Sequence, residues 1–237
     1  MKIPRFARLI LVLAMVGQAH AAPDPVDALK QQEPGLYRLF LESNGYAKQL
    51  AAYANQQGFR QPYENLGTTV HEMIHIASAV HAGFFIDGVY YEPYLRADAW
   101  PELKNSDVGN FLLPEERSLI SSVYLPNTPK NNLGNVLDEI NAYSHVAGFI
   151  CRNEPASADK QVHNLAGHMF LLEAYLRAAR TRLPADYMKL GASRESRGAI
   201  ETLYTRAVDA LKACRVPDSR IPGRETKHFL SLGRRAK

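Results

Sequence analysis

Two histidines and a glutamate occur together in the segment His71-Glu72-Met73-Ile74-His75. On an α-helix, residues four positions apart lie on the same face, one turn apart, so the two imidazoles can bind one metal ion. Glu72 is rotated by about 100° from His71, which places its carboxylate beside such an ion rather than on it. A carboxylate in that position can take a proton from water at the metal and return it to a leaving group. The segment therefore predicts a metal site that activates water.

Zinc is the metal that suits this pattern. Two neutral imidazoles and one oxygen ligand are a common zinc donor set, and zinc lowers the pKa of bound water to about 7. The residues within the motif, Met73 and Ile74, are apolar, and Glu72 is the only Asp, Glu, Lys or Arg between Leu66 and Val80. This composition indicates a buried helix at an active site rather than a helix on the surface.

The segment resembles the H-E-x-x-H motif of the zincin metallopeptidases. The resemblance covers five residues and their helical context. It implies a zincin-like helical domain with Zn²⁺ as cofactor, Glu72 as general base and acid, and a protein or peptide as substrate. In the gluzincin group, to which thermolysin belongs, a glutamate on a second helix downstream is the third metal ligand.

Glu139 is the predicted third ligand. It lies between Val136 and Tyr143 on the apolar side of a predicted helix, where a carboxylate is costly unless something pairs with it. A zinc ion would be such a partner. Asp138 is expected on the opposite, polar side of that helix, facing away from the site. In thermolysin-like enzymes an acidic residue four positions after the ligand orients a zinc histidine, but Tyr143 occupies that position here.

His81 is the alternative third ligand. It stands ten residues after His71, so the segment is also similar to the metzincin pattern H-E-x-x-H-x-x-G-x-x-H. Ser78 occupies the glycine position of that pattern, and the preceding residues contain no helix breaker. A continuing helix would turn His81 about 120° away from His75. The sequence therefore favours Glu139.

Hydrolysis of an amide produces an oxyanion, which a second hydrogen-bond donor usually helps to stabilise. In gluzincins this donor is commonly a histidine or tyrosine downstream of the third ligand. His168 fits that order and is the predicted catalytic donor, although an ordinary helix histidine is the competing interpretation. Tyr90, Tyr91 and Tyr94 are alternatives.

The elements that would position these residues are mostly helices. Apolar residues recur at helical spacing over about residues 36–58, 65–82, 114–124, 130–151, 158–180 and 194–214. Two β-prone triplets, Phe84-Phe85-Ile86 and Val89-Tyr90-Tyr91, flank Asp87-Gly88, which is a two-residue hairpin signal. The predicted fold class is therefore mainly α (α+β): one zincin-like helical domain over residues 22–237, with a short β-hairpin.

Residues 1–21 have the layout of a secretory signal peptide. A basic start with Lys2, Arg5 and Arg8 precedes the apolar run 9–16 and the small-x-small pattern Ala19-His20-Ala21. The run is too short to span a bilayer. We therefore expect a periplasmic or secreted protein with no stable membrane anchor.

The remaining 216 residues are sufficient for one domain with a sizeable core. The formal net charge of the whole chain, +4, falls to +1 without the three basic residues of the signal peptide. This balance does not support nucleic-acid binding. No feature of the sequence indicates a particular oligomeric state.

Cys151 and Cys214 are the two cysteines of the chain. In an oxidising compartment a disulfide between them is expected, with two buried thiols as the alternative. Their spacing does not fit a metal or redox pair.

Taken together, these features predict an exported zinc-dependent metallopeptidase. Two other functions use the same residues. One is a zinc-binding protein without catalysis, in which the metal joins two helices. The other is an amidase that cleaves cell-wall peptides.

Overall fold

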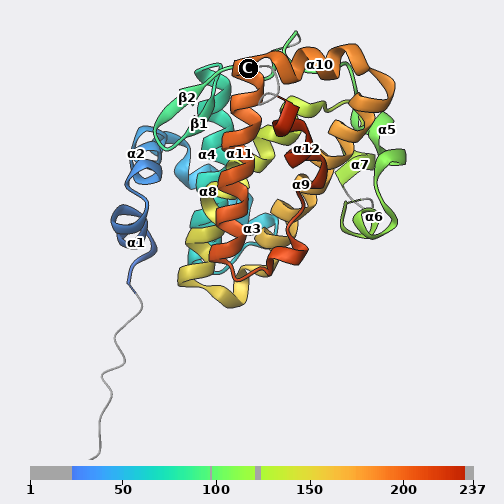
Figure 1. Ribbon diagram of the computed structural model, residues 1–237. Coiled ribbons are helices and arrows are strands. Elements are labelled where there is room, and N and C mark those ends of the chain that lie inside the picture. Colours follow the sequence, from blue (N-terminus) through green and yellow to red (C-terminus); the bar gives the residue numbers. More distant parts are fainter. Residues whose placement is uncertain (1–22, 97, 121–123, 233–237) are drawn as a thin grey trace, which may run out of the picture.

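The computed structural model describes residues 23–96, 98–120 and 124–232 (Figure 1). The predicted signal peptide, residues 1–21, lies outside the described residues. The helices are α1 Pro25–Gln32, α2 Pro34–Glu42, α3 Asn44–Gln56, α4 Pro62–Val80, α5 Asn105–Val108, α6 Pro114–Ile120, α7 Tyr124–Asn127, α8 Leu133–Asn153, α9 Asp159–Arg182, α10 Pro184–Ala192, α11 Arg194–Ala213 and α12 Arg224–Leu232. The strands are β1 Phe84–Ile86 and β2 Val89–Tyr91. The predicted fold class, mainly α with a short hairpin, is confirmed.

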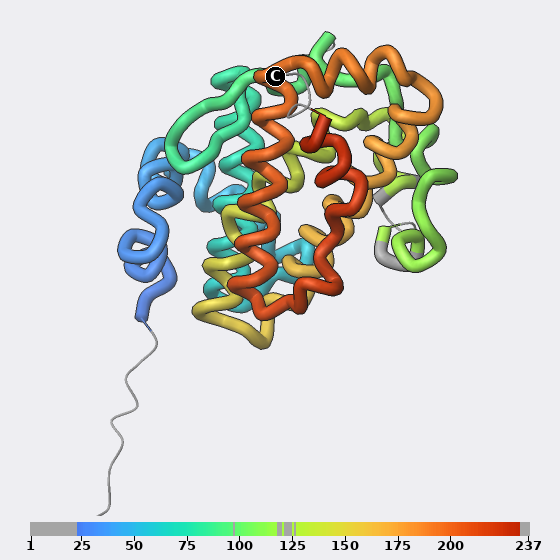
Figure 2. The backbone as a smooth tube through the Cα atoms, in the orientation of Figure 1, coloured from blue at the N-terminus to red at the C-terminus, as the bar shows by residue number. Residues whose placement is uncertain are grey.

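Helix α8 is the central element of the fold. It packs against α4 on one side and against α9 and α11 on others, and Figure 2 shows these long helices lying side by side. Apolar side chains of α8 contribute to both apolar clusters, one shared with α9 and α11 and the other with α1, α2 and α4. Several of its polar side chains are also buried, among them Asp138, Asn141 and His145.

Helix α4 carries the predicted metal-binding motif and lies very close to α8. Pro62 occupies its first turn, where the missing N–H costs nothing. The close approach depends on Gly67, because a Cβ atom there would lie 2.5 Å from Cδ1 of Ile150 on α8. The helix ends where Ala82 adopts a left-handed backbone conformation with φ of 49° and Gly83 donates its N–H to the carbonyl of Ser78 at 3.1 Å.

The hairpin has the turn that its sequence predicts. Phe84 pairs with Tyr91, and Ile86 pairs with Val89. The two turn residues, Asp87 and Gly88, have φ of 52° and 85°. Positive φ at both central positions matches the twist of the two strands and is typical of an Asp-Gly turn. Strand β1 is buried, and it contacts α4 and α8.

The short helices differ from the prediction. The single helix expected over 36–58 is two helices, α2 and α3, which are separated at Ser43. Helices α1, α10 and α12 were not predicted. Each has only eight or nine residues, which is too few for apolar periodicity to stand out. A local signal is present in two of them, a proline in the first turn at Pro25 and Pro184.

The disulfide between Cys151 and Cys214 is formed, with 5.3 Å between the two Cα atoms. It joins the C-terminal end of α8 to the C-terminal end of α11. The prediction is confirmed. Among the described residues, no helix combines the length and the apolar character needed to cross a membrane.

Candidate metal centre

Helices α4 and α8 bring together the three side chains predicted as metal ligands. Nε2 of His71 and Nε2 of His75 are 3.0 Å apart, and each is 3.6 Å from Oε2 of Glu139. Within the part of the chain that the structure describes, this is the one group of three or more such side chains whose ligand atoms all lie within 4.8 Å of one another.

The triangle of ligand atoms is close in size to that of a tetrahedral metal site. In a tetrahedral site with bonds of about 2.0–2.1 Å, neighbouring ligand atoms lie about 3.3–3.5 Å apart, and the three observed distances are on either side of this range. Two bare imidazole lone pairs would repel each other at 3.0 Å, so either the hydrogen of an N–H group or a metal ion must lie between the two nitrogens. The donor set of two imidazoles and one carboxylate therefore fits zinc.

Asp138 orients His75 from behind. Its Oδ2 accepts a hydrogen bond from Nδ1 of His75 at 2.6 Å and another from the hydroxyl of Tyr94 at 3.2 Å. When the ring of His75 is neutral and its proton is on Nδ1, Nε2 presents a lone pair to a metal ion. Carboxylate–histidine pairs of this kind raise the basicity of a metal ligand and hold its ring in place.

The expectation that Asp138 faces away from the site was wrong. That expectation assumed that the polar side of the helix faces water, but α8 is covered on this side as well. Asp138 and Glu139 differ by about 100° around the helix axis. Both side chains nevertheless reach His75 on α4. Glu139 lies near Nε2 of the ring, and Asp138 accepts a hydrogen bond from Nδ1.

The ionisation of the three ligands is strongly coupled. In the metal-free protein, burial and the charge of His75 lower the pKa of His71 to about 3. Burial also acts to lower the pKa of His75, but its hydrogen bonds to Asp138 and Glu139 outweigh burial and raise this pKa to about 11. For Glu139, burial is outweighed by the hydrogen bond to His75, and the pKa falls to about 2. The cluster therefore holds a positive charge at His75, where a metal ion would also be favourable.

Glu72 lies beside the three ligands and is not one of them. Its side chain is half-buried and lines a cavity of about 230 Å³ together with His71 and Tyr143. Burial raises the pKa of Glu72, and the carboxylates of Glu139 and Asp138 raise it further against the opposing effect of His75. A raised carboxyl pKa suits a group that must both accept and return a proton.

His168 is buried near the third ligand. Its Nδ1 donates a hydrogen bond to the carbonyl of Asn164 at 2.8 Å, and its ring stacks on Tyr143 with 5.4 Å between centroids. Burial lowers the pKa of His168, against the opposing charge of Glu139. In the neutral form with the proton on Nδ1, the other ring nitrogen is an acceptor. The predicted role as an oxyanion donor stays a prediction and requires the protonated form.

The alternative third ligand, His81, lies elsewhere. It follows the last residue of α4, is exposed, and stacks on Tyr90 of β2 with 4.1 Å between ring centroids. It does not belong to the group of ligand atoms around His71 and His75.

Of the tyrosines considered as oxyanion donors, Tyr94 donates its hydroxyl hydrogen to Asp138.

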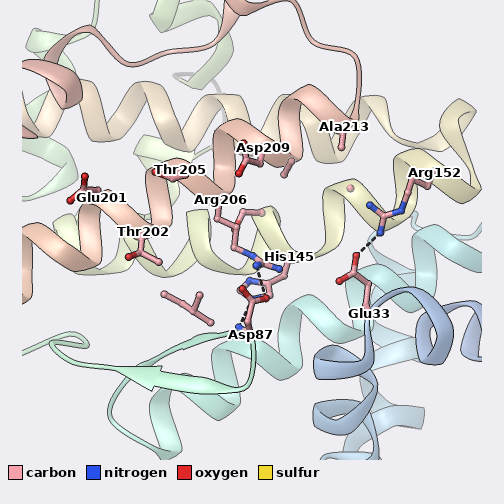
Figure 3. A pocket seen from close by; sticks show the side chains of 14 residues that line it. Glu33, Asp87, His145, Arg152, Glu201, Thr202, Thr205, Arg206, Asp209 and Ala213 are labelled. Carbon is pink, nitrogen blue, oxygen red and sulfur yellow. Dashed lines mark hydrogen bonds and ion pairs between the residues drawn. The ribbon is translucent and has the colours of Figure 1, made fainter.

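A second cavity, of about 520 Å³, lies at the tip of the hairpin (Figure 3). Figure 3 shows two pairs of oppositely charged side chains that point toward each other. Arg206 pairs with Asp87 at 2.6 Å, and Arg152 pairs with Glu33. None of the three predicted metal ligands lines this cavity. Its ion pairs connect the hairpin to α11 and the start of α2 to α8.

Comparison of the chain with protein-family models, with curated proteins and with solved structures found no match. The functional argument therefore depends on the residues of the site itself. The observations that carry it are the spacing of the three ligand atoms, the support of His75 by Asp138, and the position of Glu72 beside the ligands.

Proposed function

We propose that this protein is a zinc-dependent hydrolase of peptide bonds. His71, His75 and Glu139 hold the zinc ion, and water completes its coordination. The observation that carries the proposal is the triangle of ligand atoms, with sides of 3.0, 3.6 and 3.6 Å. Zinc in such a site polarises a carbonyl group and generates a nucleophile from water at neutral pH.

Glu72 supplies the proton transfers in this proposal. As a carboxylate it accepts the proton of the attacking water, and as a carboxylic acid it gives that proton to the leaving amine. Its raised pKa supports both steps. Asp138 keeps the ring of His75 in the tautomer that binds metal, and Tyr94 in turn holds Asp138. A peptide is the proposed substrate because the motif resembles that of the zincin metallopeptidases.

The disulfide between Cys151 and Cys214 supports the proposed location outside the cytoplasm. Disulfides form and persist in the periplasm and in secreted proteins, and they are rare in reducing compartments. The location and the signal peptide are parts of the same proposal. A protein purified from the culture medium or the periplasm and beginning near residue 22 would support both.

The test measures zinc content and hydrolysis for the wild type and for the Glu72→Gln variant. Catalysis predicts one zinc per chain in both proteins and cleavage of a quenched fluorescent peptide library by the wild type alone. The Glu201→Gln variant, at an exposed glutamate of α11, is the control and should cleave like the wild type.

Other outcomes would support the other functions. Tight zinc binding without cleavage of any peptide or cell-wall fragment would indicate a metal that only joins α4 to α8. Cleavage of cell-wall peptides but not of the library would indicate the amidase. Absence of bound zinc in the wild type would contradict the proposal as a whole.

A further inference from the structure

The cavity beside Glu72 has one lysine in its wall. This cavity is lined by residues of α3 and the segment after it, and of α4, α8 and α9. Nζ of Lys160, near the start of α9, donates a hydrogen bond to the carbonyl of Gln57 at 3.1 Å and lies 3.7 Å from the centre of the Phe59 ring. Both Gln57 and Phe59 also line the cavity. Lys160 is exposed as a residue, and these two contacts hold its ammonium group at the cavity wall.

A buried amide lies in the same cavity wall. Gln161 is 1% exposed, and its Nε2 donates a hydrogen bond to Oγ1 of Thr68 at 3.1 Å. Its Oε1 is buried and has no hydrogen-bond partner among the described residues. Buried polar atoms are almost always hydrogen-bonded, and leaving one unsatisfied is costly. Gln161 therefore forms a buried polar part of the wall beside Lys160, fixed by its hydrogen bond to Thr68.

The size and the charges of the cavity restrict what it can hold. Its volume of about 230 Å³ is below the range of about 300–1,000 Å³ that is usual for sites of drug-sized ligands, so it suits a single side chain. Two charged side chains line it, Lys160 and Glu72. The proposed reaction occupies Glu72 with the attacking water, which leaves Lys160 as the charge that a substrate side chain meets.

We propose that this cavity binds an acidic residue of the substrate, so that the enzyme prefers peptides with Asp or Glu beside the cleaved bond. The substrate carboxylate pairs with Nζ of Lys160, which lines the cavity. The inference rests on the proposed function, because it places the substrate next to Glu72. It assigns the substrate class that the motif alone leaves open.

The test uses ligand binding and not turnover. Cobalt(II) replaces zinc in the protein, and the visible absorption of the cobalt reports on ligands that enter its coordination shell. Three probes of similar length are titrated: the hydroxamates of N-acetyl-glutamate, N-acetyl-glutamine and N-acetyl-lysine. We expect the glutamate compound to bind roughly two- to fivefold more tightly than the glutamine compound, as for one exposed ion pair, and the lysine compound to bind most weakly.

Variants of Lys160 distinguish a binding role from a structural one. Lys160→Gln should abolish the preference for the glutamate compound, and Lys160→Glu should favour the lysine compound. Lys48→Glu, at an exposed lysine of α3 that does not line the cavity, should leave the order unchanged. Equal binding of the three probes, or an order that the Lys160 variants do not alter, would overturn the inference and leave the hydrolase proposal intact. Failure to hold cobalt, or a cobalt spectrum that no hydroxamate changes, would overturn both.

Discussion

Oδ2 of Asp138 accepts a hydrogen bond from Nδ1 of His75 at 2.6 Å, and the opposite nitrogen of the same ring lies 3.0 Å from Nε2 of His71. One imidazole thus connects a supporting carboxylate to the position where a metal would bind. The carboxylate comes from α8, which also carries Glu139. Asp138 and Glu139, which are consecutive residues of α8, therefore contact opposite nitrogens of the His75 ring.

Removal of the negative charge of Asp138 should weaken metal binding. In Asp138→Asn the side chain keeps its shape but loses the charge that stabilises a cation at His75. We expect zinc affinity to fall about 10- to 100-fold, the usual effect of losing such a partner, as measured by competition with a chromogenic chelator. Asp209→Asn, at an exposed aspartate of α11, is the control. An unchanged affinity would mean that Asp138 has no influence on the metal.

The identity of the third ligand can be tested with two alanine variants. Glu139→Ala should lose bound zinc because it removes the oxygen that lies 3.6 Å from both histidine nitrogens. His81→Ala should keep one zinc per chain because its ring stacks on Tyr90 outside the site. Zinc per molecule, measured by atomic emission after dialysis, gives the result. Loss of zinc from His81→Ala alone would support the metzincin-like arrangement instead.

His145 should make the fold sensitive to acid. Its Nδ1 donates to the carbonyl of Asn141 at 2.8 Å, and burial, with a contribution from Arg206, lowers its pKa to about 3. In the unfolded chain the pKa is near 6.5. Below pH 6.5 the unfolded state binds a proton that the folded state does not. The contribution of His145 to stability is therefore complete above pH 6.5 and is lost as the pH falls from 6.5 toward 3, by up to about 1.4 kcal/mol per pH unit.

The measurement for His145 is the free energy of unfolding by urea at several pH values between 7 and 4, with EDTA present to remove any effect of zinc. His145→Gln should lower stability at pH 7 but reduce the slope with pH. His163→Gln, at an exposed histidine of α9, should keep the slope of the wild type. Identical slopes for all three proteins would contradict the assignment.

The disulfide should contribute to stability without affecting metal binding. It closes a loop with a sequence separation of 63 residues, for which the chain-entropy model gives about 4 kcal/mol. The Cys151→Ala, Cys214→Ala double variant should therefore unfold at a temperature lower by roughly 10 °C, as followed by circular dichroism. Zinc content should stay at the wild-type value, because the ligands lie on α4 and in the first half of α8. A variant that unfolds at the wild-type temperature would show that the cross-link adds nothing.

Several features of this protein were determined by the sequence alone because they depend on local geometry. The relation of His71, Glu72 and His75 follows from the pitch of one helix. The hairpin follows from Asp87-Gly88, since positive φ at both positions is what its turn requires. The long helices follow from apolar periodicity over many turns.

Only the tertiary structure decided how α4 and α8 face each other. Glu139 was identified from the cost of burying a carboxylate, whereas Asp138 was missed because the polar side of α8 was assumed to face water. The close contact at Gly67 and Ile150 sets the distance between the two helices, and no local pattern encodes it. The same holds for Lys160, whose contacts with Gln57 and Phe59 join segments about one hundred residues apart. Such relationships depend on packing across the whole core, and periodicity along one element carries no information about them.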